Sequence, residues 1–188
     1  MTDLDPKLAL RRKMRALRAD LARSNPKAAR HVVDHFRLSS IATVAGYRAL
    51  GTELSPGPLM QALSLAGVRL ALPVCVGADE PLIFRSWSPG EELIPDTLGV
   101  PSPGPAATII RPDLVIAPLL AFDRTGGRLG QGGGHYDRTL EALRAQGPIL
   151  VVGLAYAGQE VAEVPSEPHD QKLDAILTET EYMEVKKP

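Results

Sequence analysis

The chain has a single cysteine, few aromatic residues and no long apolar run, and each shortage narrows what it can be. With Cys75 alone it cannot form an intramolecular disulfide, which is typical of proteins from reducing compartments. The apolar surroundings of Cys75 predict a buried small side chain rather than a nucleophile. No apolar run is long enough to span a membrane, and the charged N-terminus lacks the apolar core of a secretory signal. We therefore expect a cytoplasmic protein without membrane contacts.

Neither positive nor negative charge predominates in the sequence. The net charge is −1, and 44% of the 188 residues are hydrophobic while 23% are charged. This composition is ordinary for a globular protein and removes the bulk electrostatic argument for a nucleic-acid partner. The length suits one domain over residues 1–188, with a core large enough to fold alone. We expect a monomer without a nucleic-acid partner.

The first segment predicts a helix over about residues 5–22. Its apolar side chains recur at helical spacing, at Leu10, Met14, Leu17 and Leu21. A second stripe, about 85° away around the helix, is basic and consists of Lys7, Arg11, Arg15 and Arg18. One face can therefore pack while the neighbouring face presents a row of cations.

Strands and helices then alternate. Strand-like runs cover residues 43–50, 68–76, 82–87, 114–122 and 149–155. Helices are expected from the cap and proline at Ser24–Pro26 to about Phe36, over 57–66, and from Tyr136 to a stop at Gly147. The proline-rich stretch 94–105 is expected to be an ordered loop without regular structure. This order predicts an α/β protein, with α/β/α layers around a mixed, mostly parallel sheet.

One glycine-rich stretch, residues 128–137, follows the predicted buried strand and opens the next helix. Glycines at 130, 132, 133 and 134 let backbone N–H groups close around an anion, and the helix dipole points to the same place. Arg128 adds a forked cation, and Asp137 in the first helical turn can hold magnesium. The stretch matches neither the Walker motif nor the dinucleotide G-x-G-x-x-G pattern. It predicts a phosphate site, although a loop made glycine-rich for close packing would share the pattern.

The stretch resembles the 5-formyltetrahydrofolate cyclo-ligase family. The strand end Pro118-x-x-x-Phe122-Asp123 and the sequence Gly126-Gly-Arg128-Leu-Gly130-Gln-Gly132-Gly-Gly134-His135-Tyr136-Asp137 match that family's central motif. The opening Lys7-x-x-x-Arg11, Glu53, Leu72-Pro73 and the closing Pro165–Asp170, Leu173-Asp174 and 176–179 resemble it in order. The likeness extends over nearly the full length.

The resemblance implies a ligase of folate one-carbon metabolism. It implies ATP- and Mg²⁺-dependent conversion of 5-formyltetrahydrofolate to 5,10-methenyltetrahydrofolate through a phosphorylated formyl group. It also implies residue roles. Catalytic roles would go to Arg128, Tyr136 and Asp137. ATP would be held by Lys7, Arg11, Arg128, Leu129, Gly130, Gln131, Gly132, Gly133, Gly134, His135 and Tyr136. The folate would contact Glu53, Gln131, Gly132, Gly133, Gly134 and His135, and Mg²⁺ would be held by Asp137 and Asp170.

Plainer interpretations stay open for several of these residues. Lys7 and Arg11 can be the solvated face of a helix, and Glu53 can be a helix-entry acid. Asp170 can form an ordinary loop ion pair, and Tyr136 can serve packing only. Phe84 and Trp87 fit the core or rim of a hairpin better than a stack against the pterin.

Two positions depart from the family pattern. His135 stands where the family often has a tyrosine, and Ser102 stands between prolines where many relatives have a polar or acidic residue.

Two other classes of function stay open. A sugar-phosphate isomerase or acyl-carrier transferase would use the glycine loop without ATP. A non-catalytic folate- or nucleotide-binding protein would bind without turnover.

Overall fold

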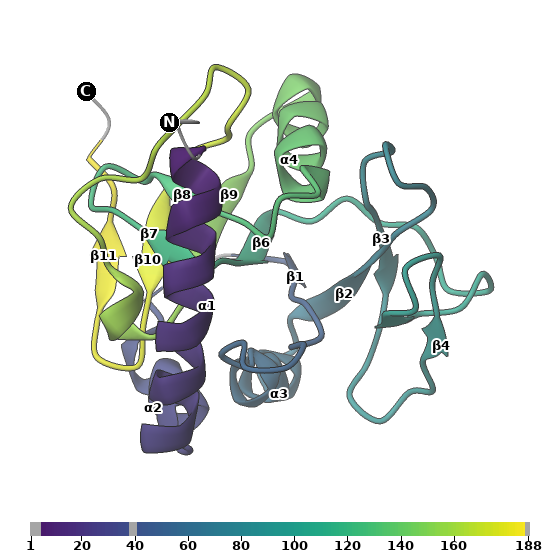
Figure 1. The fold of residues 1–188 in the computed structure, drawn as a ribbon. Helices are drawn as coiled ribbons and strands as arrows, with labels where there is room; N and C mark the ends of the chain where they lie inside the picture. Colours follow the sequence, from purple (N-terminus) through teal and green to yellow (C-terminus); the bar gives the residue numbers. More distant parts are fainter. Residues whose placement is uncertain (1–4, 38–40, 187–188) are drawn as a thin grey trace.

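The structure is a computed structural model that describes residues 5–37 and 41–186. A seven-stranded sheet forms its centre, in the order β11-β10-β9-β6-β1-β2-β3 (Figure 1). The five central strands are parallel, namely β10 (Ala175–Leu177), β9 (Leu150–Leu154), β6 (Leu114–Pro118), β1 (Thr43–Ala45) and β2 (Arg69–Val74). The edge strands β3 (Ile83–Ser86) and β11 (Tyr182–Glu184) are antiparallel to their neighbours. The predicted mixed, mostly parallel α/β sheet is confirmed.

Helices cover both faces of this sheet. On one face, α2 (Ala28–His35) and α3 (Gly57–Leu65) pack on β1, β2, β6 and β9 in one apolar cluster. On the other face, α4 (His135–Gln146) packs through Leu140 and Leu143. The long helix α1 (Pro6–Ser24) crosses the front of the molecule in Figure 1 and packs through Met14 against a small two-stranded sheet. That sheet consists of β7 (Ala121–Phe122) and β8 (Arg128–Leu129).

The strand order indicates where a ligand-binding crevice lies in the sheet. The chain runs from β1 outward to β2 and later returns to β6 on the other side of β1. In parallel α/β sheets, such a reversal opens a crevice at the carboxyl ends of the strands on either side of it. Here that crevice lies beyond the ends of β1 and β6.

Several predicted boundaries were wrong. The strand expected over 43–50 ends at Ala45. The run 114–122 breaks after Pro118, because the Leu120 N–H turns to the Leu129 carbonyl in the small sheet. Helix α2 begins at Ala28 rather than at Pro26, and Asn25 instead ends α1 by donating to Leu21. The expected loop 94–105 contains a short ladder between β4 (Ile94–Pro95) and β5 (Pro101–Ser102). A 3₁₀ turn at Ala157–Gln159 completes the described elements.

None of the described helices is both long enough and apolar enough to cross a membrane.

Candidate active site

A cavity of about 230 Å³ opens at the carboxyl ends of β1, β2 and β6. Its wall combines Tyr47, Pro73 and Pro118 from the strand ends with Leu119, Leu82 and Tyr136. Most of these side chains are apolar, so the cavity suits a flat organic ligand. The polar groups are fewer, and they come from the glycine stretch with Arg128, from Glu53, and from Arg48 and Asp96.

The glycine loop opens α4, as the sequence predicts, but it follows the short strand β8 rather than the long strand expected over 114–122. Gly132 and Gly134 have φ angles of 111° and 67°, values that favour glycine. A side chain at Gly134 would also strike Arg138, whose Nη1 lies 2.6 Å from the position of the missing Cβ. Gly134 precedes α4 without a side-chain cap, so the first N–H groups of that helix remain available.

Helix α1 holds the glycine loop by its carbonyl groups. Arg11 Nε donates to the Gly130 carbonyl at 3.1 Å, and Arg15 Nη2 donates to the Gln131 carbonyl at 3.3 Å. In a trans peptide the next N–H points away from the preceding carbonyl, so the N–H groups of Gln131 and Gly132 are turned away from α1. Within the described chain, the backbone N–H groups of residues 131–137 donate no hydrogen bond. The loop is therefore arranged as a set of free donors.

Arg128 is the central cation of the site. Its side chain is only 3% exposed, and its Nη2 donates to Asp137 Oδ1 at 2.6 Å. Its guanidinium lies 5.8 Å from the centre of the Tyr136 ring. Its Nε is buried and has no hydrogen-bond acceptor among the described residues, an arrangement that is costly unless a ligand completes it. Asp137 Oδ1 also accepts the Gln171 N–H at 3.0 Å, which joins α4 to the closing segment.

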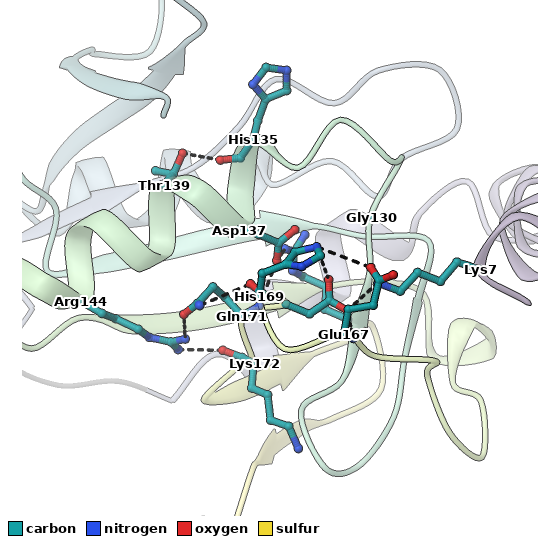
Figure 2. Close-up of polar contacts among 12 residues, drawn as sticks. Lys7, Gly130, His135, Asp137, Thr139, Arg144, Glu167, His169, Gln171 and Lys172 are labelled. Carbon is teal, nitrogen blue, oxygen red and sulfur yellow. Dashed lines mark hydrogen bonds and ion pairs between the residues drawn. The ribbon is translucent and has the colours of Figure 1, made fainter. Parts of the chain in front are cut away.

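Lys7 binds the closing segment rather than the glycine loop. Its Nζ contacts Asp170 Oδ2 at 2.6 Å. It also contacts Glu167 Oε2 at 2.7 Å (Figure 2). Burial lowers the pKa of Lys7, but these two bonds outweigh burial and raise it. Burial acts to raise the pKa of Asp170, but Lys7 and the Glu167 N–H hold it below its usual value. Together with His169, the two acids form a group whose ligand atoms lie within 4.8 Å of one another.

Glu53 lines the cavity and is nearly buried. Its side chain is 8% exposed, and its Oε2 accepts the Leu50 N–H at 2.9 Å. Burial raises the pKa of this carboxyl, while the Leu50 N–H and Arg18 act against that rise. Burial and the nearby Glu53 also raise the pKa of Tyr136, so its hydroxyl stays protonated. A buried carboxylate at this place can recognise an amine or an amidine-like edge of a ligand.

A second cavity, of about 310 Å³, lies beside the first. Its lining is mostly polar, and its charged side chains are the acids Asp123, Glu163, Glu167 and Asp170 and the cations Arg128 and Lys172. Arg128 lines both cavities. The site is therefore divided into an apolar compartment and a polar compartment that share one buried cation.

The structure brings most of the expected site residues to these two compartments. Arg128, Gly130, Gln131, Gly133, His135, Tyr136 and Glu53 line the first cavity, and Asp170 lines the second. Asp137 accepts hydrogen bonds from Arg128, which lines both cavities, and from the Gln171 N–H at the second cavity. It lies outside the group formed by Glu167, His169 and Asp170.

Sequence reasoning missed two arginines near the site. Arg18 is buried against Glu53. Arg138 binds the Gly133 carbonyl at 2.9 Å and the Ala78 carbonyl at the β2–β3 turn at 2.9 Å. The basic stripe contained Arg18 but gave no sign that it turns inward.

Three bacterial 5-formyltetrahydrofolate cyclo-ligases are similar to this chain in sequence. The Escherichia coli protein is 36% identical over 148 residues, which are 76% of this chain and 80% of the relative. The Mycolicibacterium smegmatis protein is 35% identical over 144 residues, 72% and 73% of the two chains. The Haemophilus influenzae protein is 30% identical over 178 residues, 89% and 95% of the two chains.

Solved structures agree with this likeness. The NMR structure of Aquifex aeolicus 5,10-methenyltetrahydrofolate synthetase matches with a TM-score of 0.79 at 26% identity, covering 97% of this chain and 94% of the other. A 5,10-methenyltetrahydrofolate synthetase from Mycoplasma pneumoniae matches with a TM-score of 0.71, covering 93% of this chain and 99% of the other. Its sequence identity is 22%, so this match supports the fold only. The family model spans residues 5–179, and together with these relatives it shows that the chain belongs to the 5-formyltetrahydrofolate cyclo-ligase family of enzymes.

Proposed function

We propose that the chain converts 5-formyltetrahydrofolate to 5,10-methenyltetrahydrofolate with consumption of ATP, in a Mg²⁺-dependent reaction that releases ADP and phosphate. The observation that carries this proposal is the pair of cavities that share Arg128. The apolar cavity suits the flat folate, and the glycine loop on its wall together with Arg128 suits the nucleotide phosphates. The acids of the polar cavity, Asp170 among them, suit the Mg²⁺ that would accompany these phosphates. A cation between the two cavities lies where a phosphoryl group would pass from one ligand to the other.

The residues present fit a nucleotide phosphate. The N–H groups of residues 131–137 lack acceptors in the described chain, and Arg128 Nε is buried without a partner. Phosphate oxygens are strong acceptors that complete such donors. Arg11 and Arg15 would act on ATP through the loop, since both hold its carbonyl groups.

The residues also fit a magnesium ion. Mg²⁺ prefers oxygen ligands and is commonly held by one or two carboxylates together with substrate phosphates. Asp137 and Asp170 would hold it, and the adjacent Gln171 links the two through its N–H bond to Asp137. When bound, the ion supplies positive charge that neutralises the phosphates. Both carboxylates are paired with cations here, Asp137 with Arg128 and Asp170 with Lys7.

The chemistry needs positioning more than a protein nucleophile. The formyl oxygen attacks the γ-phosphorus, ADP leaves, and a phosphorylated iminium-like group forms at the 5-nitrogen. The 10-nitrogen then attacks the same carbon, the C–O bond breaks, phosphate departs, and the proton of the 10-nitrogen is lost to solvent or phosphate. In this scheme Arg128 and the loop N–H groups stabilise the transferring phosphoryl group, and Glu53 orients the folate.

An absorbance assay for the methenyl chromophore tests the proposal. Purified protein is mixed with 5-formyltetrahydrofolate, Mg²⁺ and ATP, and a parallel reaction omits ATP. Product that forms only with ATP supports the function. Folded protein that yields no product under these conditions contradicts it, even where thermal shifts show ligand binding.

A further inference from the structure

A small third cavity of about 90 Å³ adjoins the apolar compartment. It shares Tyr47 and Arg48 with that compartment and is completed by Ser55, Gly57 and Trp87. No aspartate or glutamate is among the residues that line it. The small cavity therefore continues the apolar one while offering no negative charge of its own.

Two of its polar groups, on Arg48 and Trp87, are donors without acceptors among the described residues. Arg48 is exposed, and within residues 5–37 and 41–186 it forms no hydrogen bond or ion pair. Trp87 has a buried Nε1–H that finds no acceptor. The other arginines around the active site are all engaged: Arg11 and Arg15 with the glycine loop, Arg18 with Glu53, and Arg128 with Asp137. Arg48 is thus the one cation lining the apolar cavity that is both exposed and unpaired in the described chain.

The position of Arg48 also suggests where a ligand leaves the cavity. Arg128 is buried where the apolar cavity adjoins the polar one, whereas Arg48 is exposed. Leu50 and Leu98 line the same cavity and are likewise exposed, so the rim offers apolar surface next to a cation. The same cavity therefore offers a buried cation for a reacting end, apolar surface for a flat middle and an exposed cation for an anionic tail.

We propose that Arg48 and the small cavity beside it bind the carboxylates of the glutamate tail of the folate substrate. The assignment rests on the proposed function, because a folate carries a p-aminobenzoyl ring followed by glutamate. Guanidinium groups pair strongly with carboxylates through parallel N–H donors. The ring would lie along Leu50 and Leu98, and the α- and γ-carboxylates would reach Arg48.

The test compares two substrates that differ only in the tail. The Arg48→Gln variant is assayed with 5-formyltetrahydrofolate and with 5-formyltetrahydropteroate, which ends at the benzoyl carboxylate and lacks glutamate. We expect KM for the glutamate-bearing substrate to rise about threefold to tenfold, the range for an exposed charge-assisted pair, with kcat nearly unchanged. KM for the pteroate should change much less. Equal effects on both substrates, or none on either, overturn the proposal.

A control and a binding readout separate this proposal from the proposed function. Arg30 is exposed on α2 and lines neither cavity, so Arg30→Gln should leave both KM values unchanged. Trp87 is the only tryptophan and lines the small cavity, so its fluorescence reports binding directly. If the wild-type protein lacks turnover, the proposed function fails. Fluorescence titration of Arg48→Gln with the two folates still decides whether Arg48 recognises the tail.

Discussion

Arg18 Nη1 lies 3.6 Å from Glu53 Oε1, and both side chains are almost fully buried, with exposed fractions of 7% and 8%. Arg18 Nε also donates to Thr52 Oγ1 at 3.1 Å, and Nη1 donates to the Leu119 carbonyl at 3.4 Å. The guanidinium therefore ties α1 to the segments that follow β1 and β6. Its charge stands directly behind the carboxylate that lines the apolar cavity.

The first prediction concerns the charge of Glu53. Burial raises the pKa of Glu53 and Arg18 lowers it, so Arg18→Met should raise that pKa further. If the ionised carboxylate binds the folate, the acid limb of kcat/KM for 5-formyltetrahydrofolate should move to higher pH. The measurement is kcat/KM across a pH series, with an ATP-free blank at each pH.

Loss of fold has to be separated from this effect. Leaving Glu53 buried without its partner should cost about 3 kcal/mol of unfolding free energy, and Arg18→Met/Glu53→Gln should recover part of it. Arg23→Met, which removes an exposed cation from the same helix, serves as the matched control. A folded Arg18→Met protein with an unmoved acid limb would remove Arg18 from this role.

Asp137→Asn tests whether Asp137 both pairs with Arg128 and holds Mg²⁺. The substitution keeps the shape but removes the charge that faces Arg128 at 2.6 Å and the oxygen pair available to Mg²⁺. We expect kcat to fall about 100-fold or more, and the thermal midpoint to fall as well because Arg128 is left buried without its ion-pair partner; kcat is therefore measured at a temperature at which the variant is still folded. Glu141→Gln, an exposed site one turn along α4, should behave as wild type. Full activity across a Mg²⁺ titration would exclude Asp137 from the metal site.

Arg11→Gln tests whether α1 orients the glycine loop. Without the bond from Arg11 Nε to the Gly130 carbonyl, the loop N–H groups lose one of their two anchors on α1. We expect KM for ATP to rise about tenfold while KM for the folate moves little. The neighbouring Arg12 is exposed and forms no side-chain bond in the described chain, so Arg12→Gln is the control. A rise of both KM values by the same factor would indicate general loosening of the site instead.

The sequence was most informative where local pattern and tertiary structure agree. The glycines at 130, 132, 133 and 134 before a helical pattern predicted the loop, and α4 begins within a residue of the expected place. The run 150–154 is apolar because β9 is covered on both faces, so it could be assigned as a strand from composition alone.

The failures have equally local causes. Strand β10 has three residues and β11 has three, too few to show a period. Lys7 meets Asp170 across 163 positions, and no spacing rule relates residues that far apart. Arg18 belongs to the basic stripe by periodicity, yet its side chain turns inward because it pairs with Glu53 and donates to the Leu119 carbonyl. These partners are distant in sequence, so only the tertiary structure identifies them.

The turn before Arg128 depends on another buried acid. Asp123 is 3% exposed, and its Oδ1 accepts the N–H groups of Thr125 at 2.8 Å and Gly127 at 3.0 Å. Its Oδ2 accepts the N–H of Val164 at 2.8 Å. One carboxylate thus joins the β7–β8 hairpin, which carries Arg128, to the segment that leads to Asp170.

Asp123→Asn should therefore destabilise the protein in a pH-dependent way. Burial raises the pKa of Asp123, but the hydrogen bonds from Val164, Thr125 and Gly127 outweigh burial and hold the pKa below its usual value. Stability from such a carboxylate is present above its pKa in the unfolded chain and is lost as pH falls through its pKa in the folded chain. We expect Asp123→Asn to lower the free energy of unfolding by about 2 kcal/mol at neutral pH, and the gap to wild type to narrow in acid. Urea unfolding at several pH values measures this gap, with the exposed Asp20→Asn as control. A gap that stays constant with pH would mean that shape, and not the ionised carboxylate, holds the hairpin to the closing segment.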